Sequence, residues 1–343
     1  MLKKTFSFSS SKTVCYFDAS LAQIGNLVEK DRSVFITDQH IFDLHKKYFK
    51  GTKCIQIPAG ESFKVQHTVD QIIEQLISFG VDRQTTIIGV GGGVVTDITG
   101  YVASVYMRGI PFGFVPTSIL GMVDASIGGK NGIDIGNYKN MVGVIRQPGF
   151  LFYDVSLLRS LPSEEWVNGF AEIIKHAAIK DISLFTELEK SSINSYRKNK
   201  EALTNLIRRN VMIKSGIVQK DEFESHERRL LNFGHTLGHA VENVYKLPHG
   251  HAISIGMKAA CLISEDMLNF KGTARVTGLL RQYGLPVDIP VDFGKVVEIM
   301  RMDKKKTRDI MHYVLLEKIG NAVIKPIPMN HLEKLLYSIA RAR

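Results

Sequence analysis

The chain has 343 residues and carries 44 lysines and arginines against 34 aspartates and glutamates, a net charge of +10. Apolar residues make up 44% and charged residues 23%, ordinary values that exclude intrinsic disorder. No run of 18 apolar residues occurs and the start of the chain lacks a signal-peptide core, so we expect a cytoplasmic protein. Its three cysteines form no CxxC pair, which argues against a disulfide framework or a cysteine zinc site. The positive charge suits either nucleic acid or a small anion.

In the first half, short apolar runs end in small or polar residues. Three of them are typical of buried strands, at 33–38, 85–93 and 112–118, and a stretch with helical period lies at 66–79. Strands that alternate with helices predict a Rossmann-like α/β domain with a mainly parallel sheet. Such sheets bind ligands beyond the carboxyl ends of their strands.

From about residue 162 the pattern changes to long amphipathic stretches, which predicts a helical second domain. These stretches lie at 163–180, 182–192, 199–220, 231–245, 251–268, 273–283 and 292–302. Pro162 and Ser163 are typical of a helix start, so we place the boundary just before them. We therefore expect an α/β domain over 1–160 and an all-α domain over 161–343.

Four of the eleven histidines fall within seventeen residues, at His235, His239, His249 and His251. The first two are four residues apart on an expected helix, so both rings project from one face and can reach one metal ion or one anion. Glu242 continues that face. The segment is not an HExxH metalloprotease motif, because threonine follows the first histidine.

Glu172, Lys175 and His176 lie within one helical turn of an otherwise apolar segment. Burying a charge costs free energy unless the charge is paired or bound to metal. Either Glu172 and Lys175 pair with each other, or they face a site. Catalytic zinc takes three protein ligands and leaves one position open, so Glu172 is a candidate to complete the histidine set.

A glycine turn follows the second expected strand and opens a helix. Gly91, Gly92 and Gly93 would let a phosphate approach the helix N-terminus, but the spacing matches neither common phosphate motif, and a structural turn is the alternative. Asp97, in the first turns of that helix, can cap the helix or hold a ribose hydroxyl. Asp38, at the end of an earlier strand, is another ribose candidate or a turn aspartate.

The loop at 123–140 combines glycines with Asp124, Lys130, Lys139 and Asn140. Two glycines before Lys130 suit a lysine aimed at a phosphate or an oxyanion, whereas the alternative is a solvated loop.

Further polar residues precede the histidine segment, at Lys214, Arg228 and Asn232. The basic residues of the chain are interleaved with candidate metal ligands and acids rather than with aromatic residues. A small phosphorylated or carboxylated substrate therefore fits better than nucleic acid. Solvated basic residues are expected at Arg229, Lys220 and the run 303–306.

Nine segments resemble the 3-dehydroquinate synthase family, within the sugar-phosphate cyclase superfamily, between about Asp38 and Leu316. In chain order they are GGGVVTD, YMRGIPF, VPTSILGMVDASIGGKNG, YKNMVG, GFAEIIKHA, KSGIVQKDE, RRLLNFGHTLGHAVE, LPHGHAISIGM and MDKKK. The resemblance implies a homodimer with an N-terminal NAD-binding domain, a helical metal-binding domain and an active site between the two.

The resemblance also implies roles for individual residues. The implied ligands of Zn²⁺ or Co²⁺ are Glu172, His235 and His249. The implied substrate residues are Asp124, Lys130, Lys175, Lys214, Arg228, Asn232 and His239, with Arg108 reaching the phosphate from the other subunit. The implied NAD-binding residues are Asp38, Glu61, Lys64, Gly91, Gly92, Gly93, Asp97, Thr117, Ser118, Lys130, Lys139 and Asn140.

The implied reaction turns 3-deoxy-D-arabino-heptulosonate 7-phosphate into 3-dehydroquinate and phosphate, a step of the shikimate pathway to aromatic amino acids. NAD⁺ transiently oxidises the C5 alcohol, whose pKa the metal lowers. Phosphate then leaves by β-elimination, the hydride returns, and the ring opens and closes again by an aldol step. A substrate with a carboxylate and a phosphate explains why cations converge.

Four positions depart from the family pattern. Ser118 and Asn131 each replace a threonine, and Tyr138 replaces a glycine. In the fourth, the usual HGE becomes HGH, so that either His249 or His251 could be the third metal ligand. The position directly after Leu-Pro favours His249.

Three other functions are alternatives. A different sugar-phosphate cyclase is disfavoured by Arg228, Asn232 and His239, positions that commonly differ in such relatives. A metal-dependent polyol dehydrogenase, which would release NADH, fits the YKNMVG and NFGHTLGHA segments poorly. A basic nucleic-acid-binding protein would show steep salt dependence and no need for metal.

Overall fold

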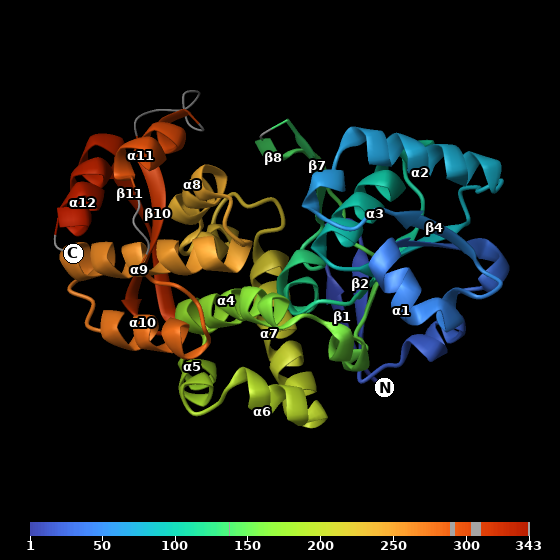
Figure 1. Ribbon diagram of the computed structural model, residues 1–343, viewed down its shortest axis with the longest axis horizontal. Coiled ribbons are helices and arrows are strands. Elements are labelled where there is room, and N and C mark those ends of the chain that lie inside the picture. Colours follow the sequence, from blue (N-terminus) through green and yellow to red (C-terminus); the bar gives the residue numbers. More distant parts are fainter. Residues whose placement is uncertain (137, 289–291, 303–309, 342–343) are drawn as a thin grey trace. The chain divides into compact units, whose positions relative to one another are not determined.

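The computed structural model describes residues 1–136, 138–288, 292–302 and 310–341 (Figure 1). They form two compact units that are interleaved along the sequence. The first unit comprises Met1–Glu165 and Asn199–Phe223, and the second comprises Trp166–Lys198 and Glu224–Arg343. The assignment of separate functions to 1–160 and 161–343 stays a prediction. Among the described residues, no helix has the length and apolar character needed to cross a membrane.

A seven-stranded sheet forms the base of the first unit, in the order β1-β2-β9-β6-β5-β3-β4. Its strands are β1 (Leu2–Ser7), β2 (Lys12–Phe17), β3 (Ser33–Asp38), β4 (Lys53–Ile57), β5 (Thr86–Gly91), β6 (Phe112–Pro116) and β9 (Phe150–Phe152). Neighbours from β2 to β4 pair in parallel, whereas β1 joins this sheet antiparallel. The three predicted strands are β3, β5 and β6, and the mainly parallel fold is confirmed.

The central strands of this sheet are almost entirely buried, and helices cover them. Every residue of β5 after Thr86 is buried, as expected for a parallel strand covered on both faces. The covering helices are α1 (Gln39–Phe49), α2 (Gln66–Ser78) and α3 (Gly93–Val105). In α2, predicted at 66–79, Val69, Ile72 and Leu76 form one buried stripe. A separate antiparallel hairpin of β7 (Lys130–Ile135) and β8 (Tyr138–Ile145) packs its first strand against α3.

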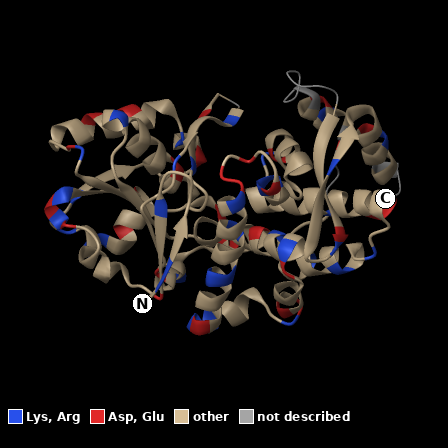
Figure 2. Ribbon diagram, turned by 180° about the vertical axis from the view of Figure 1, so that it is seen from behind, with Lys and Arg blue, Asp and Glu red and all other residues tan. Residues whose placement is uncertain are grey.

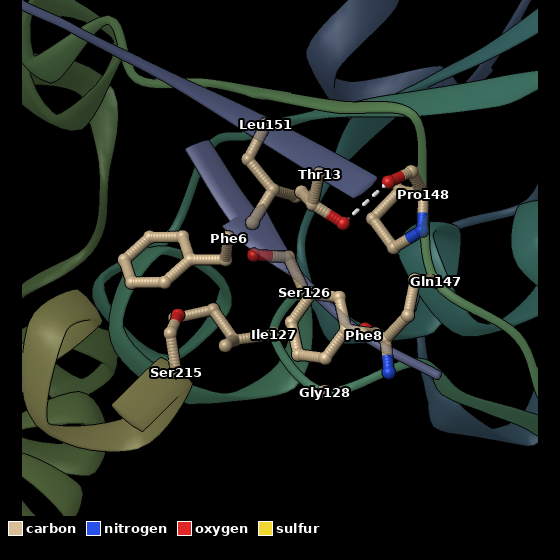
Figure 3. Close-up of a pocket in the computed structure, with 10 residues that line it drawn as sticks. All are labelled: Phe6, Phe8, Thr13, Ser126, Ile127, Gly128, Gln147, Pro148, Leu151 and Ser215. Atoms are coloured by element: carbon tan, nitrogen blue, oxygen red, sulfur yellow. Dashed lines mark hydrogen bonds between the residues drawn. The ribbon is translucent and has the colours of Figure 1, made fainter. Parts of the chain in front are cut away.

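The helix α7 (Lys200–Lys220) belongs to the first unit, although helices of the second unit precede and follow it in sequence. Ser215 of α7 lines a cavity of about 10 Å³ together with Phe6 of β1 and Ser126 (Figure 3). Beside them, the Thr13 hydroxyl donates to the Pro148 carbonyl oxygen at 2.7 Å. A cavity of this size has room for about one water molecule, so it is a packing seam between α7 and the β1–β2 hairpin rather than a ligand site.

The second unit is mainly helical, as predicted. Its helices are α4 (Ser163–Lys180), α5 (Ile182–Glu189), α6 (Ile193–Lys198), α8 (His235–Tyr245), α9 (His249–Leu268), α10 (Thr273–Gln282), α11 (Phe293–Met302) and α12 (Met329–Arg341). It also contains an antiparallel ribbon of β10 (Ile310–Lys318) and β11 (Asn321–Pro328), which the sequence patterns did not predict. The C-terminal part is therefore helical with one two-stranded addition, rather than strictly all-α.

Charged residues are distributed over both units. Figure 2 shows basic and acidic positions interspersed along the helices and loops of each unit. Nucleic-acid-binding proteins instead gather lysines and arginines into a patch or stripe. The run 303–306, predicted to be solvated, lies outside the described residues.

Candidate active site

The turn from β5 into α3 places the predicted glycines at the carboxyl edge of the sheet. Gly91 ends β5, Gly92 is the N-cap of α3, and Gly93 is its first residue. A Cβ atom at Gly91 would lie 2.5 Å from the side chain of Val95, a distance at which one of the two would have to move. Packing of strand against helix therefore requires glycine at position 91.

The neighbouring strands β3 and β6 end in predicted cofactor residues at the same edge. After β6, the Thr117 N–H donates to the Gly91 carbonyl oxygen at 2.9 Å. The next residue, Ser118, accepts the Gly121 N–H at 3.0 Å through its hydroxyl, a task that a threonine hydroxyl could also perform. Asp38 ends β3 and caps α1 by accepting one of its backbone N–H groups at 2.8 Å. The capping alternative for Asp38 is thus present in the structure.

Three of the predicted cofactor residues, Lys64, Asp97 and Asn140, form a cluster around the buried Lys64 ammonium. The ammonium of Lys64 donates to Asp97 Oδ2 at 2.5 Å and to Asn140 Oδ1 at 2.6 Å. Burial raises the pKa of Asp97 to about 6, although the Lys64 charge acts to lower it. Burial lowers the pKa of Lys64, but the carboxylates of Asp97 and Glu61 outweigh this effect and raise it above its ordinary value. The cluster thus links three segments that are far apart in sequence.

Asp134, which the sequence patterns did not single out, holds the β7–β8 hairpin to this cluster. Its carboxylate accepts the Asn140 N–H at 2.7 Å, and its own N–H donates to the Lys64 carbonyl oxygen at 2.8 Å. Asn140 has a left-handed φ of 54°, which the bond to Asp134 helps to maintain. Lys130 and Lys139 are exposed on the same hairpin.

Two departures from the family pattern lie on this hairpin. Asn131 is 4% exposed, and its amide donates to the carbonyl oxygens of Gly129 at 2.7 Å and Arg146 at 2.9 Å. It therefore supports the backbone beside Lys130. Tyr138 is 68% exposed in the single chain.

Asp124 and Lys214, both predicted to hold substrate, form an ion pair within the first unit. Lys214 Nζ lies 2.8 Å from Asp124 Oδ1 and also donates to the Asp124 carbonyl oxygen at 2.7 Å. Lys214 comes from α7, and its charge acts to lower the pKa of Asp97. The placement of α7 in this unit thus brings the ion pair of two predicted substrate-binding residues near the cofactor cluster.

Arg108 lies in a short turn, Tyr106–Arg108, that follows α3. Both Met107 and Arg108 have left-handed backbone conformations, with φ of 49° and 66°, and both are exposed. Such conformations cost about 1–2 kcal/mol each for residues other than glycine and are concentrated at functional sites.

In the second unit, Glu172, His235 and His249 form a group of candidate metal ligands. Their ligand atoms all lie within 4.8 Å of one another. Glu172 Oε1 is 3.4 Å from His235 Nε2 and 3.2 Å from His249 Nε2. Glu172 comes from the middle of α4, whereas the two histidines are the first residues of α8 and α9. Two imidazoles and one carboxylate are a common donor set of catalytic zinc.

Lys175, one helical turn after Glu172, contacts the other carboxylate oxygen of that residue. The two side chains are 1% and 0% exposed. Burial raises the pKa of Glu172, but the charges of Lys175 and His235 outweigh burial, so its pKa lies well below the usual range. Glu172 is therefore an ionised acceptor at neutral pH, as a metal ligand must be.

The two histidines of the HGH sequence have different surroundings. Among the described residues, His249 belongs to two groups of potential metal ligands and His251 to none. The second group consists of His239, Glu242 and His249. The carbonyl oxygen of His251 accepts a hydrogen bond from the Ser254 hydroxyl at 2.8 Å. The choice of His249 over His251 stays a prediction, and the membership of His249 in both groups supports it.

Arg228 and Asn232 lie on the short helix Glu227–Asn232, directly before α8. Arg228 is 2% exposed, and the Asn232 amide donates to Glu224 Oε1 at 2.6 Å. Glu224, which the sequence patterns missed, also accepts the Arg229 Nε–H through its carbonyl oxygen at 3.3 Å. Arg229 is thus half-buried rather than solvated as expected, whereas Lys220 is exposed as expected.

Two family models match this chain and together cover most of it. The model for the N-terminal part of 3-dehydroquinate synthase matches residues 54–168, and that for the C-terminal part matches residues 169–306. A 3-dehydroquinate synthase from Pyrococcus abyssi is 40% identical over 287 residues, which is 83% of this chain and 85% of that protein. The chain belongs to the 3-dehydroquinate synthase family. The resemblance drawn from the nine segments is confirmed.

Solved structures confirm the fold of this 3-dehydroquinate synthase family member. ValA, a 2-epi-5-epi-valiolone synthase from Streptomyces hygroscopicus with NAD⁺ and Zn²⁺ bound, is 28% identical, with a TM-score of 0.87 and 100% coverage of both chains. A 2-deoxy-scyllo-inosose synthase complexed with carbaglucose-6-phosphate, NAD⁺ and Co²⁺ is 24% identical, with the same TM-score and coverage of 98% of this chain and 99% of that one.

Proposed function

We propose that the chain converts 3-deoxy-D-arabino-heptulosonate 7-phosphate into 3-dehydroquinate and phosphate, using NAD and a divalent metal ion, Zn²⁺ or Co²⁺. The observation that carries the proposal is the fully buried carboxylate of Glu172 facing His235 and His249 in a chain of this family. A carboxylate kept ionised at 0% exposure needs cationic partners, and a metal ion fits between it and two imidazoles.

The residues present in this chain suit both the metal ion and NAD. Glu172, His235 and His249 would hold the metal, and the glycine turn with Lys64, Asp97 and Asn140 would hold NAD at the carboxyl edge of the sheet. When bound, NAD supplies a hydride acceptor and donor, and the metal lowers the pKa of a substrate hydroxyl. The other residues that would contact bound NAD are Asp38, Glu61, Thr117, Ser118, Lys130 and Lys139.

The chain's own residues then bind and orient the substrate. Lys175 keeps Glu172 ionised, so the metal set retains its negative charge. The substrate carboxylate and phosphate would be bound by the cations Lys130, Lys214 and Arg228. The substrate hydroxyls would be bound by Asp124, Asn232 and His239. Arg228, Asn232 and His239, at positions that commonly differ in other sugar-phosphate cyclases, favour this substrate over a sugar phosphate that lacks a carboxylate.

We infer that the protein acts as a cytoplasmic homodimer in which Arg108 of one subunit reaches the phosphate bound by the other. Two observations support the dimer. Arg108 is exposed in a strained backbone conformation. In addition, the β7–β8 hairpin exposes Tyr138 at 68% and Met141 at 66%, apolar side chains that a second copy could cover. Light scattering after size exclusion tests the dimer, and a single-chain mass would contradict it.

The activity test is phosphate release from the heptulosonate phosphate with NAD⁺ and Zn²⁺ or Co²⁺, with and without chelator. We expect release that stops on chelation and no net accumulation of NADH. Glucose 6-phosphate, which lacks the carboxylate, is the control substrate. Accumulating NADH would indicate a dehydrogenase, and release only from the control would indicate a different cyclase; either result contradicts the proposal.

A further inference from the structure

The helices that carry the second-unit site are joined by unusually close backbone contacts. A Cβ atom at Gly256 of α9 would lie 1.9 Å from the Gly234 carbonyl oxygen, and one at Gly238 of α8 would lie 3.1 Å from the Ala252 carbonyl oxygen. Only glycine permits this approach of α8 and α9. The crossing therefore fixes side chains of α8 relative to the first residue of α9, His249.

The start of α9 is held from a second direction. Asn168 of α4 accepts the Gly250 N–H at 2.5 Å, and a Cβ atom at Gly250 would lie 2.4 Å from the Asn168 carbonyl oxygen. The backbone next to His249 is thus clamped to the helix that carries Glu172. What remains to be set is the rotation of the imidazole ring.

The two ring nitrogens of His249 face different carboxylates. Nε2 lies 3.2 Å from Glu172 Oε1, and Nδ1 lies 3.2 Å from Glu242 Oε2. Glu242 is on α8, and its side chain is 8% exposed. A neutral imidazole can give a lone pair to a metal from one nitrogen only while the other carries the proton and donates it.

We propose that Glu242 is a positioning residue: it accepts the Nδ1–H of His249 and so presents Nε2 to the ion held with Glu172 and His235. This inference rests on the metal site of the proposed function. Glu242 fixes both the orientation and the tautomer of His249, and it takes no part as a ligand. It also has a structural reason to stay ionised, since its nearly buried carboxylate has the imidazole N–H as a partner.

The competing possibility is that His239, Glu242 and His249 bind a second ion of their own, because their ligand atoms also lie within 4.8 Å of one another. Both groups contain His249. Occupying both would require this one ring to give a lone pair from each nitrogen, which a neutral imidazole cannot do. We therefore expect one metal ion per chain.

The first experiment compares Glu242→Gln with the wild type, using Zn²⁺ and Co²⁺ alone. We expect Glu242→Gln to weaken metal affinity about 10–100-fold in chelator competition, with one ion per chain in both proteins and an altered visible spectrum of the Co²⁺ form. The matched control is Glu265→Gln, which removes the same charge from an exposed position on α9 and should leave affinity and spectrum unchanged.

Unchanged metal affinity and an unchanged Co²⁺ spectrum in Glu242→Gln would overturn the proposal. Two bound ions in the wild type together with one in the variant would overturn it as well, because Glu242 would then be a ligand. If Glu242→Gln does not fold, ¹⁵N-histidine NMR of the wild-type zinc protein decides instead. We expect the His249 resonances of a ring protonated at Nδ1, and metal at Nδ1 would refute the proposal. A wild type that binds no metal at all would contradict the proposed function itself, which separates the two failures.

Discussion

Lys64 and Asp97 form an ion pair across 33 residues of sequence, with Nζ 2.5 Å from Oδ2 and side chains that are 4% and 18% exposed. The pair connects the segment after β4 to the first turns of α3. Because the two residues follow different strands of the sheet, their meeting depends on β4, β3 and β5 being placed side by side.

The pKa of Asp97 predicts how stability depends on pH. Its ordinary value is 3.8, and burial raises it to about 6 in the folded chain despite Lys64. Between about pH 4 and pH 6 the folded state therefore binds more protons than the unfolded state, and the contribution of Asp97 to the free energy of unfolding falls as pH rises. Relative to Asp97→Asn, the free energy of unfolding of the wild type should fall by roughly 3 kcal/mol across this window, as measured by urea denaturation.

The control for that prediction is Asp43→Asn. A hydrogen bond from Gln39 lowers the pKa of Asp43, so its contribution should rise with pH, the opposite sign. If the difference in free energy of unfolding between wild type and Asp97→Asn rises with pH, as it should for Asp43, then the ion pair with Lys64 outweighs burial.

Glu172 and Lys175 should behave as a coupled buried pair. Exchanging Glu172 for Gln removes the carboxylate beside the Lys175 ammonium, which is buried at 1% exposure, so we expect a loss of about 3–5 kcal/mol in the free energy of unfolding of the metal-free protein. The double variant Glu172→Gln/Lys175→Met should recover much of that loss, because the buried cation is removed together with its carboxylate. Both variants should lack metal and activity. Additive losses in the double variant would show that the pair is not coupled.

His249 and His251 should differ in metal binding when each is replaced by Ala. His249→Ala removes a member of both candidate ligand groups, so metal content measured by elemental analysis should fall to near zero. His251→Ala should keep its metal and its phosphate release, because His251 is in neither group among the described residues. Loss of metal in the His251 variant alone would reverse the assignment.

Gly100 and Asn131 are packed too closely for any side chain at position 100. A Cβ atom there would lie 1.9 Å from Asn131 Oδ1, so Gly100→Ala should cost about 1–3 kcal/mol of stability. Gly216→Ala is the matched control, because Gly216 is also in a helix of the first unit and a Cβ atom there would meet nothing within 4 Å among the described residues. It should stabilise by about 0.5–1 kcal/mol. Thermal denaturation of both variants checks this, and equal effects would contradict it.

Much of the fold follows from local pattern. The strands β3, β5 and β6 and the helix α2 have periodicities that hold within a few turns of chain, and so do α4, α7 and α9 in the later half. The same local spacing showed that Glu172 and Lys175 share a helix face and that His235 and His239 do as well. Motif order along the chain was enough to identify the family. These features depend on neighbours in sequence, which a linear pattern records directly.

Only the tertiary structure decided which residues meet from distant segments. It joined Lys64, Asp97 and Asn140, placed α7 with the first unit so that Lys214 reaches Asp124, and set Glu242 against Nδ1 of His249. It also showed the β10–β11 ribbon, which lies in a part of the chain expected to be helical and is defined by the pairing of its two strands. The physical reason is that these contacts depend on sheet order and on glycine-mediated helix crossings, which bring together residues whose separation in sequence has no fixed relation to their distance in space.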